Sequence, residues 1–421
     1  MGVAPQHFDL SLPPFALECG APLPHLHLRA WWWGPAADHA ALHALGATPA
    51  PSGDPQRALG DAAPPPPGPS AVVLPPAPTI LLCHALTGDA RAGGPGGWWE
   101  PLIGPGRALD PSKHRLLCFN QLGSCYGSFG PRDPSFPKRV DAPYAGGVPA
   151  RGHTPLPDPL LPAPLTTWDQ ARALLRALDA LGVQRLDAVI GGSVGGMLAM
   201  ALAALAPDRV GAVIPVAALD HATAWVLGFN HIARQLIADA LQRGDDATHA
   251  LGLARQLAHL SYRASPGLTA RQGRAPAVAG PWNPRAPYAM HTYLAHQGHK
   301  LAQRFDALSY LSMLDAMDHH DLGRAPPPPQ ADDTWRLPVE WTGLAQLPSL
   351  HAISVDSDML FFAVEVEAMV HRYAAARPGR PSSLHQISSP HGHDGFLLSA
   401  DQLTDALRAT LRHLPSPESL P

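Results

Sequence analysis

Short apolar segments alternate with helical segments through the middle of this chain. Residues 79–83, 115–120, 186–190 and 210–217 are apolar runs typical of buried strands. Between the second and third of these runs, residues 167–182 carry apolar side chains at helical spacing. Strands without a polar face must be covered on both sides, and helices that alternate with them provide that cover. The sequence therefore predicts an α/β fold with a mostly parallel central sheet and helices on both faces.

Two helices of this alternating region have recognisable ends. In the first, Thr167 is the expected N-cap and Gly182 the expected stop. The second helix follows the strand at 186–190 and ends before Pro207, because proline cannot continue a helix. Each helix is long enough to form the crossover connection that two parallel neighbouring strands require.

A purely helical segment interrupts the alternation. Residues 220–324 contain only helical patterns, and apolar strand patterns return at 350–355 and 383–388. We therefore predict a core domain formed by residues 1–219 and 325–421, with residues 220–324 as a helical lid domain inserted into it. Ligands of open α/β sheets bind at the carboxyl ends of the strands, which is where we expect the lid.

The chain of 421 residues contains 50 prolines, and they cluster. The main tracts are residues 46–78, 146–165 and 324–333. Proline has no backbone N–H to donate, so we expect these tracts to be exposed loops, the first of them a proline-rich loop of the core domain. The alternative is a binding site for a partner that recognises polyproline.

Charge and composition exclude several classes of partner. The net charge of −4 provides no basic surface for nucleic acid or for an anionic membrane. No uncharged apolar run of about 18 residues and no N-terminal signal pattern is present, so we expect no membrane association. The four cysteines form neither a C-x-x-C pair nor a zinc pattern. We therefore expect a cytoplasmic protein with reduced thiols.

Residues 191–195, Gly-Gly-Ser-Val-Gly, fit the G-x-S-x-G pattern of a nucleophilic serine. The pattern requires a strand before it and a helix after it, and both are predicted here. Glycines suit the positions around the serine because the strained turn leaves no room for Cβ atoms. Ser193 is therefore the candidate nucleophile, with a structural serine in a glycine-rich turn as the alternative.

A serine nucleophile needs a histidine base oriented by a carboxylate. In α/β-hydrolase folds the three residues occur in the chain order Ser, Asp or Glu, His. Asp356 and Asp358 follow one predicted strand, and His391 and His393 follow the last one. The order is right, but the pattern alone leaves both pairs open.

Acyl transfer also needs backbone N–H groups that stabilise the oxyanion. The amide of Val194, directly after the serine, is the first candidate, and the amide of Leu86 in the loop 83–90 is the second. The alternative for that loop is a plain connection. We expect no metal ion, because the histidine-rich segments 318–321 and 391–394 lack a defined ligand spacing.

Eight segments in chain order resemble the homoserine O-acetyltransferase family, whose members have an α/β-hydrolase fold. They are LLCHALTGDA, GWWEPLIGPGRALD, CFNQLGSCYGSFGP, GGSVGGML, FNHIARQ, YLAHQGHKLAQRFDALSYLSMLDAMDHHDLG, VDSDMLF and GHDGFLL. The resemblance extends from about residue 79 to 400. It implies a catalytic triad of Ser193, Asp358 and His393, with Arg234 at the carboxylate of the acceptor and Asp394 at its amino group.

The resemblance also implies an activity. It predicts acyl transfer from acyl-CoA to the hydroxyl of L-homoserine through a Ser193 acyl-enzyme, a step of methionine biosynthesis. No cofactor beyond the acyl-CoA co-substrate is expected, and the protein is expected to be a homodimer. The chain departs from the usual family pattern at Ser124, Phe129 and Leu308. Serine as acceptor or succinyl-CoA as donor are therefore alternatives, as are an ester hydrolase and a non-catalytic binding module.

Overall fold

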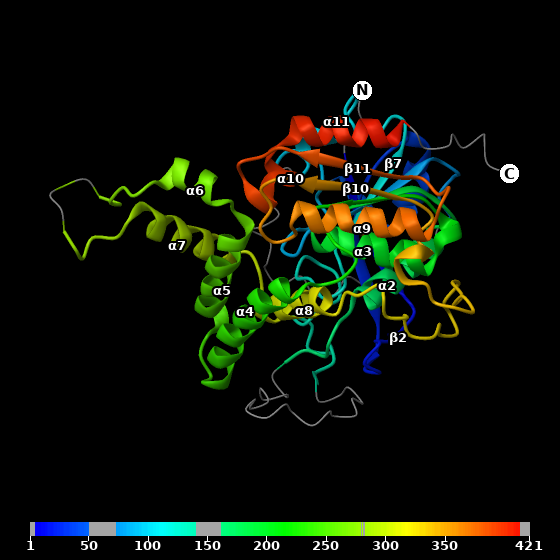
Figure 1. Ribbon diagram of the computed structural model, residues 1–421. Coiled ribbons are helices and arrows are strands. Elements are labelled where there is room, and N and C mark those ends of the chain that lie inside the picture. Colours follow the sequence, from blue (N-terminus) through cyan, green and yellow to red (C-terminus); the bar gives the residue numbers. More distant parts are fainter. Residues whose placement is uncertain (1–4, 50–72, 140–160, 279, 281–282, 413–421) are drawn as a thin grey trace.

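A computed structural model describes residues 5–49, 73–139, 161–278, 280 and 283–412, and it contains a nine-stranded central sheet (Figure 1). The strand order is β11-β10-β9-β8-β6-β7-β4-β1-β5, and a separate hairpin pairs β2 with β3. The strands are β1 (Gln6–Leu12), β2 (Phe15–Ala16), β3 (Pro22–Leu23), β4 (Leu26–Trp33), β5 (Thr48–Pro49), β6 (Thr79–Cys83), β7 (Arg115–Phe119), β8 (Leu186–Gly192), β9 (Val210–Val216), β10 (Leu350–Val355) and β11 (Ser382–Ile387).

The predicted mostly parallel sheet is confirmed. Six neighbouring strands of the sheet run parallel, in the order β7, β6, β8, β9, β10 and β11. All six correspond to the apolar runs of the sequence. The antiparallel edge made by β4, β1 and β5 was not predicted from the sequence. In β1 the buried residues alternate, with Phe8, Leu10 and Leu12 inward, which is the pattern of a strand with one polar face.

Helices cover both faces of the sheet, as expected. One face carries α2, α3 and α9, whereas α10 and α11 lie on the other (Figure 1). The helices are α1 (His39–Ala44), α2 (Thr167–Ala180), α3 (Val194–Leu205), α4 (Ala224–Gln242), α5 (Ala247–Tyr262), α6 (Ser265–Gln272), α7 (Ala289–Ala302), α8 (Ala307–Asp318), α9 (Ala363–Ala376), α10 (Gly395–Leu398) and α11 (Ala400–Leu411).

The alternating side chains of the parallel strands fill two separate cores. Leu81 and Val189 point to the α2–α3 side, where they pack with Met197. Ile80 and Ile190, their neighbours along the strands, lie in the opposite core. Both faces of β6, β7, β8, β9 and β10 are therefore buried, which explains why these strands have no polar face, whereas the edge strand β11 is only partly buried.

The start of α2 differs from the expectation. Thr166, not Thr167, is the N-cap, because its backbone is extended and its hydroxyl accepts a hydrogen bond from the Asp169 amide at 3.2 Å. Asp169 in turn accepts from the Thr166 amide at 3.1 Å, which completes a capping box. The hydroxyl of Thr167 instead contacts His320 at 2.9 Å. Gly182 follows the helix with φ of +68°, as expected of a stop.

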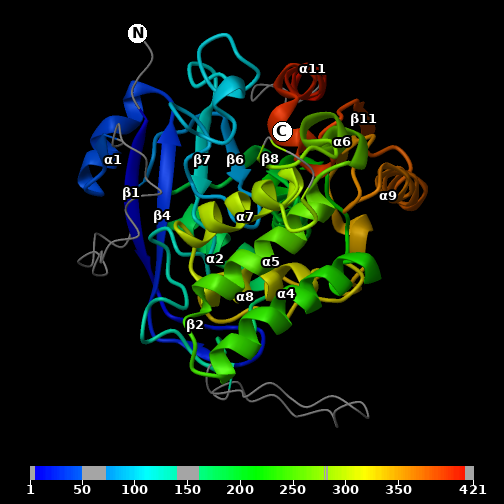
Figure 2. The same ribbon diagram turned by 90° about the vertical axis from the view of Figure 1, so that its left-hand side faces the viewer.

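Helices α4 to α8 form an insertion between β9 and β10, in agreement with the helical pattern of residues 220–324. The arrowheads of β10 and β11 point toward this insertion, and α4, α5 and α7 lie in front of the sheet edge in the turned view (Figures 1 and 2). An antiparallel bridge between His221 and Asp321 joins its two ends. Among the described residues, no helix combines the length and apolarity needed to cross a membrane. The division into a core and a lid domain stays a prediction.

The proline-rich tracts are only partly exposed. Residues 50–72 and 140–160 lie outside the described residues. In the described end of the second tract, Leu161, Ala163 and Leu165 are buried, and in the third tract Asp333 is buried. The prediction of exposed loops is therefore wrong for these parts. Proline lacks a donor, but the leucines and the aspartate beside it can still pack or pair.

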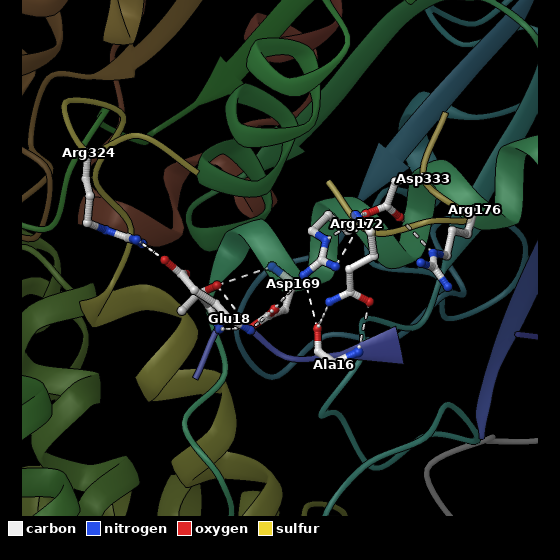
Figure 3. A network of polar contacts seen from close by, with 9 residues as sticks. Ala16, Glu18, Asp169, Arg172, Arg176, Arg324 and Asp333 are labelled. Carbon is white, nitrogen blue, oxygen red and sulfur yellow. Dashed lines mark hydrogen bonds and ion pairs between the residues drawn. The ribbon is translucent and has the colours of Figure 1, made fainter. Parts of the chain in front are cut away.

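A buried ionic network joins α2 to two segments distant in the chain (Figure 3). Its members are Ala16, Glu18, Asp169, Arg172, Arg176, Arg324 and Asp333. The Asp333 carboxylate accepts from Arg176 Nε at 2.8 Å and lies 3.4 Å from Arg172 Nη2. Glu18 pairs with Arg324, and its amide donates to Asp169 at 2.7 Å. Burial raises the pKa of Asp169 to about 7, against the opposing charge of Arg172. The network fastens the segment after the insertion to the helix layer.

Candidate active site

The candidate triad residues lie at the carboxyl ends of three parallel strands. Ser193 follows β8, Asp358 follows β10, and His393 follows β11. Parallel strands in one sheet end at the same edge, so residues far apart in the sequence meet there. This edge is also the one that the helical insertion faces (Figure 1).

Ser193 has a strained backbone, with φ of 58° and ψ of −129°. Its amide donates to the Val216 carbonyl at 2.9 Å, and its carbonyl accepts from the Gly196 amide at 2.8 Å. The side chain lies on a strand-to-helix turn, as the motif requires. A positive φ at a non-glycine residue persists only where surrounding contacts hold it, and such strain is typical of functional sites.

Glycines beside Ser193 allow this turn to pack. A Cβ at Gly195 would lie 2.2 Å from the Cys83 carbonyl oxygen and 2.6 Å from that of His84. A Cβ at Gly192 would meet the ring of Phe396 at 2.4 Å. Gly195 is therefore required because α3 approaches the end of β6 closely, and Gly192 because the serine turn packs against α10.

We expect Gly195→Ala to lower the free energy of unfolding by about 3 kcal/mol or more, because the new methyl group meets backbone atoms that cannot move aside. Gly228→Ala is the matched control, since nothing lies within 4 Å of its Cβ position on α4. There alanine should raise stability by up to about 1 kcal/mol through helix propensity. Urea unfolding of both variants measures the difference, and equal stability would contradict the close-packing argument.

Asp358 and His393 form a buried hydrogen-bonded pair. Nδ1 of His393 lies 2.7 Å from Oδ2 of Asp358, and the two side chains are 4% and 0% exposed. The other carboxylate oxygen accepts from the amides of Leu360 at 2.8 Å and Phe361 at 3.0 Å. An ionised carboxylate only accepts, so Nδ1 donates and Nε2 is left with its lone pair. That is the tautomer a general base requires.

Aromatic rings surround His393. The rings of Tyr262, Phe361 and Phe396 have centroids 5.7, 5.5 and 5.3 Å from the imidazole. Burial alone would lower the pKa of His393, but the charge of Asp358, its hydrogen bond and the charge of Asp394 together raise the pKa above the ordinary 6.5. Phe396 also contacts the Gly192 position, so one ring packs against both the base and the nucleophile turn.

The raised pKa of His393 predicts how activity falls at low pH. Protonation removes the base, so the rate of ester cleavage should fall as pH drops through the raised pKa of His393, at a pH above 6.5. Asp394→Asn removes one charge that raises this pKa, so its acid limb should lie at lower pH. The pH dependence of kcat/KM for p-nitrophenyl acetate measures both, with Asp401→Asn as an exposed control. An unmoved limb in Asp394→Asn would contradict this assignment.

The alternative candidates occupy other positions. Asp356 accepts from the Ser388 hydroxyl at 2.8 Å and the Ser389 amide at 2.9 Å, so it holds the loop after β11. His391 precedes the turn, and its amide contacts the Ser389 hydroxyl at 3.3 Å. The structure thus brings Asp358, and not Asp356, to His393.

The two candidate oxyanion donors are both available. Leu86 lies in a turn after β6 and Val194 begins α3. In the described part of the chain, neither amide donates a hydrogen bond to a protein group. The hydroxyl of Ser193 is equally unpaired there. A nucleophile and two free N–H groups at one sheet edge are the arrangement that acyl transfer needs.

Arg234 and Asp394 already have charged partners. Nη2 of Arg234 lies 2.9 Å from Asp315 and 2.8 Å from Asp318, and the side chain is 16% exposed. Nε and Nη1 of Arg234 have no partner among the described residues, so each of these two nitrogens still has an N–H that a carboxylate oxygen could accept singly. Nε of Arg263 lies 3.0 Å from Asp394. The expected roles of Arg234 and Asp394 toward an acceptor stay predictions.

A polar contact that was not predicted from the sequence supports the loop that contains Leu86. The amide of Gln121 donates to Nε2 of His84 at 3.1 Å, and its side-chain nitrogen donates to the His84 carbonyl at 2.6 Å. Burial lowers the pKa of His84 to about 4, so the ring stays neutral. His84 directly follows β6 and Gln121 lies two residues after the neighbouring parallel strand β7, which is the signal that would have predicted the contact. No group of three or more metal-ligating side chains occurs among the described residues.

The strand order, the helix layers and the serine turn define a protein of the α/β-hydrolase class. A family profile described as alpha/beta hydrolase fold matches residues 78–399. A homoserine O-acetyltransferase of Thermus thermophilus is 38% identical over 354 residues, which cover 79% of this chain and 81% of that protein. That of Salinibacter ruber is 37% identical over 339 residues, covering 77% and 85%. The chain belongs to the homoserine O-acetyltransferase family.

Solved structures share the fold. The homoserine O-acetyltransferase of Bacillus anthracis superposes with a TM-score of 0.71 at 17% identity, over 98% of this chain and 99% of that one. Esterase E22 has a TM-score of 0.69 at 17% identity, over 97% and 100%. Because both transferases and esterases superpose, the fold alone does not separate acyl transfer from hydrolysis.

Proposed function

We propose that this protein transfers an acetyl group from acetyl-CoA to the hydroxyl of L-homoserine, through a covalent intermediate on Ser193. The observation that carries the proposal is the buried contact between His393 and Asp358, in a chain that is 33–38% identical to homoserine O-acetyltransferases over about four fifths of its length. Hydrogen bonding and burial leave Nε2 of His393 as the proton acceptor.

In the first half-reaction, Ser193 Oγ attacks the thioester carbonyl while His393 takes its proton. The amides of Leu86 and Val194 stabilise the resulting oxyanion. The C–S bond then breaks, the proton returns to the CoA thiolate, and the acetyl group remains on Ser193.

In the second half-reaction, His393 takes the proton of the homoserine hydroxyl as that oxygen attacks the acetyl ester. The C–O bond to Ser193 breaks, and the proton passes to the serine oxygen. Arg234 suits the carboxylate of the acceptor, because the N–H groups of its Nε and Nη1 have no partner among the described residues and can donate to a carboxylate oxygen. Asp394 suits its ammonium group. The protein needs no cofactor besides acetyl-CoA under this proposal.

The same proposal extends to the cellular setting. A step of methionine biosynthesis that uses acetyl-CoA and an amino acid fits a cytoplasmic enzyme with small-molecule substrates and no nucleic-acid or membrane partner. We propose a homodimer. Size-exclusion chromatography with light scattering tests the dimer, and a monomeric mass would exclude it.

Mixing the protein with acetyl-CoA alone should release a burst of free CoA roughly equal to the number of sites, and add one acetyl group to the peptide that carries Ser193. Homoserine should then discharge the acetyl group much faster than buffer does, with parallel reciprocal plots when both substrates vary. Ser193→Ala is the control and should give neither burst nor adduct.

Crossing acetyl-CoA and succinyl-CoA with homoserine, serine and water separates the alternatives. Faster discharge of the acyl-enzyme by serine than by homoserine would identify serine as the acceptor. A burst of free CoA only with succinyl-CoA would identify succinyl-CoA as the donor. An adduct cleared by water as fast as by any amino acid would make the protein an ester hydrolase. Intersecting plots without an adduct would exclude the covalent mechanism.

A further inference from the structure

A single guanidinium connects the helical insertion to the loop of the candidate oxyanion donor. Arg304 lies just after α7 and is partly buried. Its Nη1 donates to the Thr87 carbonyl at 2.8 Å and to the Tyr126 hydroxyl at 2.6 Å. Thr87 directly follows Leu86, and Tyr126 lies in the loop after β7. One side chain of the insertion therefore contacts both loops beside the serine turn.

Thr87 belongs to a tight turn. The amide of Gly88 donates to the Ala85 carbonyl at 2.9 Å, so Leu86 and Thr87 are the two central residues. The start of the turn is held from the core, through the contacts of His84 with Gln121. The Arg304 contact is the one hydrogen bond that Thr87 makes in the described part of the chain. The end of the turn is thus held from the insertion.

The second contact of Arg304 is equally well supported. Burial raises the pKa of Tyr126, so its hydroxyl stays protonated and neutral. The ring of Tyr126 packs edge-to-face on Phe305, the residue after Arg304, with centroids 5.6 Å apart. Phe305 is buried. The pair Arg304–Phe305 therefore docks on Tyr126 through one polar and one apolar contact, which fixes where the guanidinium lies.

We propose that Arg304 is a positioning residue that sets the direction of the Leu86 amide and makes the oxyanion site depend on the placement of the helical insertion. The inference rests on the proposed function, in which the Leu86 amide meets the oxyanion. By fixing the Thr87 carbonyl, Arg304 fixes the peptide plane that joins Thr87 to Gly88. The amide of Gly88 in that plane donates to the Ala85 carbonyl, which shares a peptide plane with the Leu86 amide, so the closed turn leaves that amide little freedom to rotate. An oxyanion donor acts through its preorganised direction, so freedom at this turn lowers the rate of chemistry more than binding.

The test compares Arg304→Gln and Arg304→Lys with Lys300→Gln. Lys300 is an exposed cation in the last turn of α7, four residues before Arg304, so its variant removes the same charge without a contact to the core. Arg304→Lys keeps the charge but loses the planar guanidinium, so it should retain only part of the wild-type activity. Each variant is assayed with acetyl-CoA plus homoserine and with p-nitrophenyl acetate. Amide hydrogen exchange of residues 84–90 and the thermal midpoint are measured in parallel.

For Arg304→Gln we expect kcat to fall on the order of 10- to 100-fold with both acyl donors, less than the loss from removing an oxyanion donor entirely. The KM for acetyl-CoA should stay within about threefold, because the contact acts on the transition state. Amides of residues 84–90 should exchange faster, while the rest of the sheet edge is unchanged. Arg304→Lys should fall between, and Lys300→Gln should match the wild type.

Three outcomes would overturn the proposal. A higher KM for acetyl-CoA at unchanged kcat would make Arg304 a substrate-binding residue. Unchanged exchange at residues 84–90 would show that Arg304 does not hold the turn. A thermal midpoint that falls in step with activity would reduce its role to folding of the insertion. Failure of the proposed function is distinguishable, because faster exchange at 84–90 in Arg304→Gln would persist in a protein that acetylates no amino acid.

Discussion

Asp358→Asn is expected to lower kcat/KM by about 10³- to 10⁴-fold while the protein stays folded. The amides of Leu360 and Phe361 donate to the carboxylate, so the asparagine oxygen will take those two hydrogen bonds and turn its NH₂ group toward His393. The imidazole must then accept at Nδ1, which leaves the proton on Nε2. In that tautomer His393 cannot take the proton of Ser193, and the charge that raises its pKa is lost.

Asp356→Asn is the matched control for this substitution. Asp356 lies two residues away, but its oxygens accept from Ser388 and Ser389 and not from the imidazole. We expect kcat/KM to stay within a few-fold of the wild type, because the loop keeps one acceptor oxygen. Steady-state kinetics with acetyl-CoA and homoserine measure both variants, with circular dichroism as the check on folding. Equal losses in the two variants would show that the orienting aspartate is wrongly assigned.

Asp333→Ala is expected to cost about 3 to 5 kcal/mol in the free energy of unfolding. Arg172 and Arg176 have side chains only 1% and 5% exposed, and Asp333 is the carboxylate that both contact (Figure 3). Removing it leaves two buried guanidiniums without their shared counter-charge, and water cannot reach them fully. Their remaining contacts are backbone carbonyls and the ring of Phe15, with Asp169 3.6 Å from Arg172.

Asp332→Ala tests the same charge change at the neighbouring position. Asp332 is exposed and should change stability by no more than about 0.5 kcal/mol. Urea unfolding followed by tryptophan fluorescence compares the two variants under one set of conditions. If Asp333→Ala lowered the free energy of unfolding by less than about 1 kcal/mol, the two arginines would have found other partners. The expectation that they stay buried without a counter-charge would then be wrong.

Local pattern predicted the centre of the fold well. All six parallel strands correspond to predicted runs. In β6 to β10 burial on both faces leaves mostly apolar side chains and no period to misassign, whereas the edge strand β11 is only partly buried. The antiparallel edge was missed although its side chains alternate, because β4 ends in three consecutive tryptophans that hide the period of two. The exposed-loop prediction failed at Asp333 because composition cannot show which side chain in a proline tract meets a buried cation.

The serine turn and the chain order of the triad candidates were determined by the sequence alone. The apolar strand, the glycine pattern around Ser193 and the helix that follows are local in the sequence, so a few adjacent residues carry them. The contacts that those glycines permit, with Cys83 and with Phe396, are tertiary. The local pattern left open which of two nearby aspartates contacts His393, and only the family resemblance implied Asp358. The contact itself depends on the tertiary structure, through the way in which the loops after β10 and β11 approach each other. The Arg304 contact with Thr87 joins residues 217 positions apart. Only packing of the helical insertion against the sheet edge brings such groups together, because no local pattern encodes the partner of a long polar side chain.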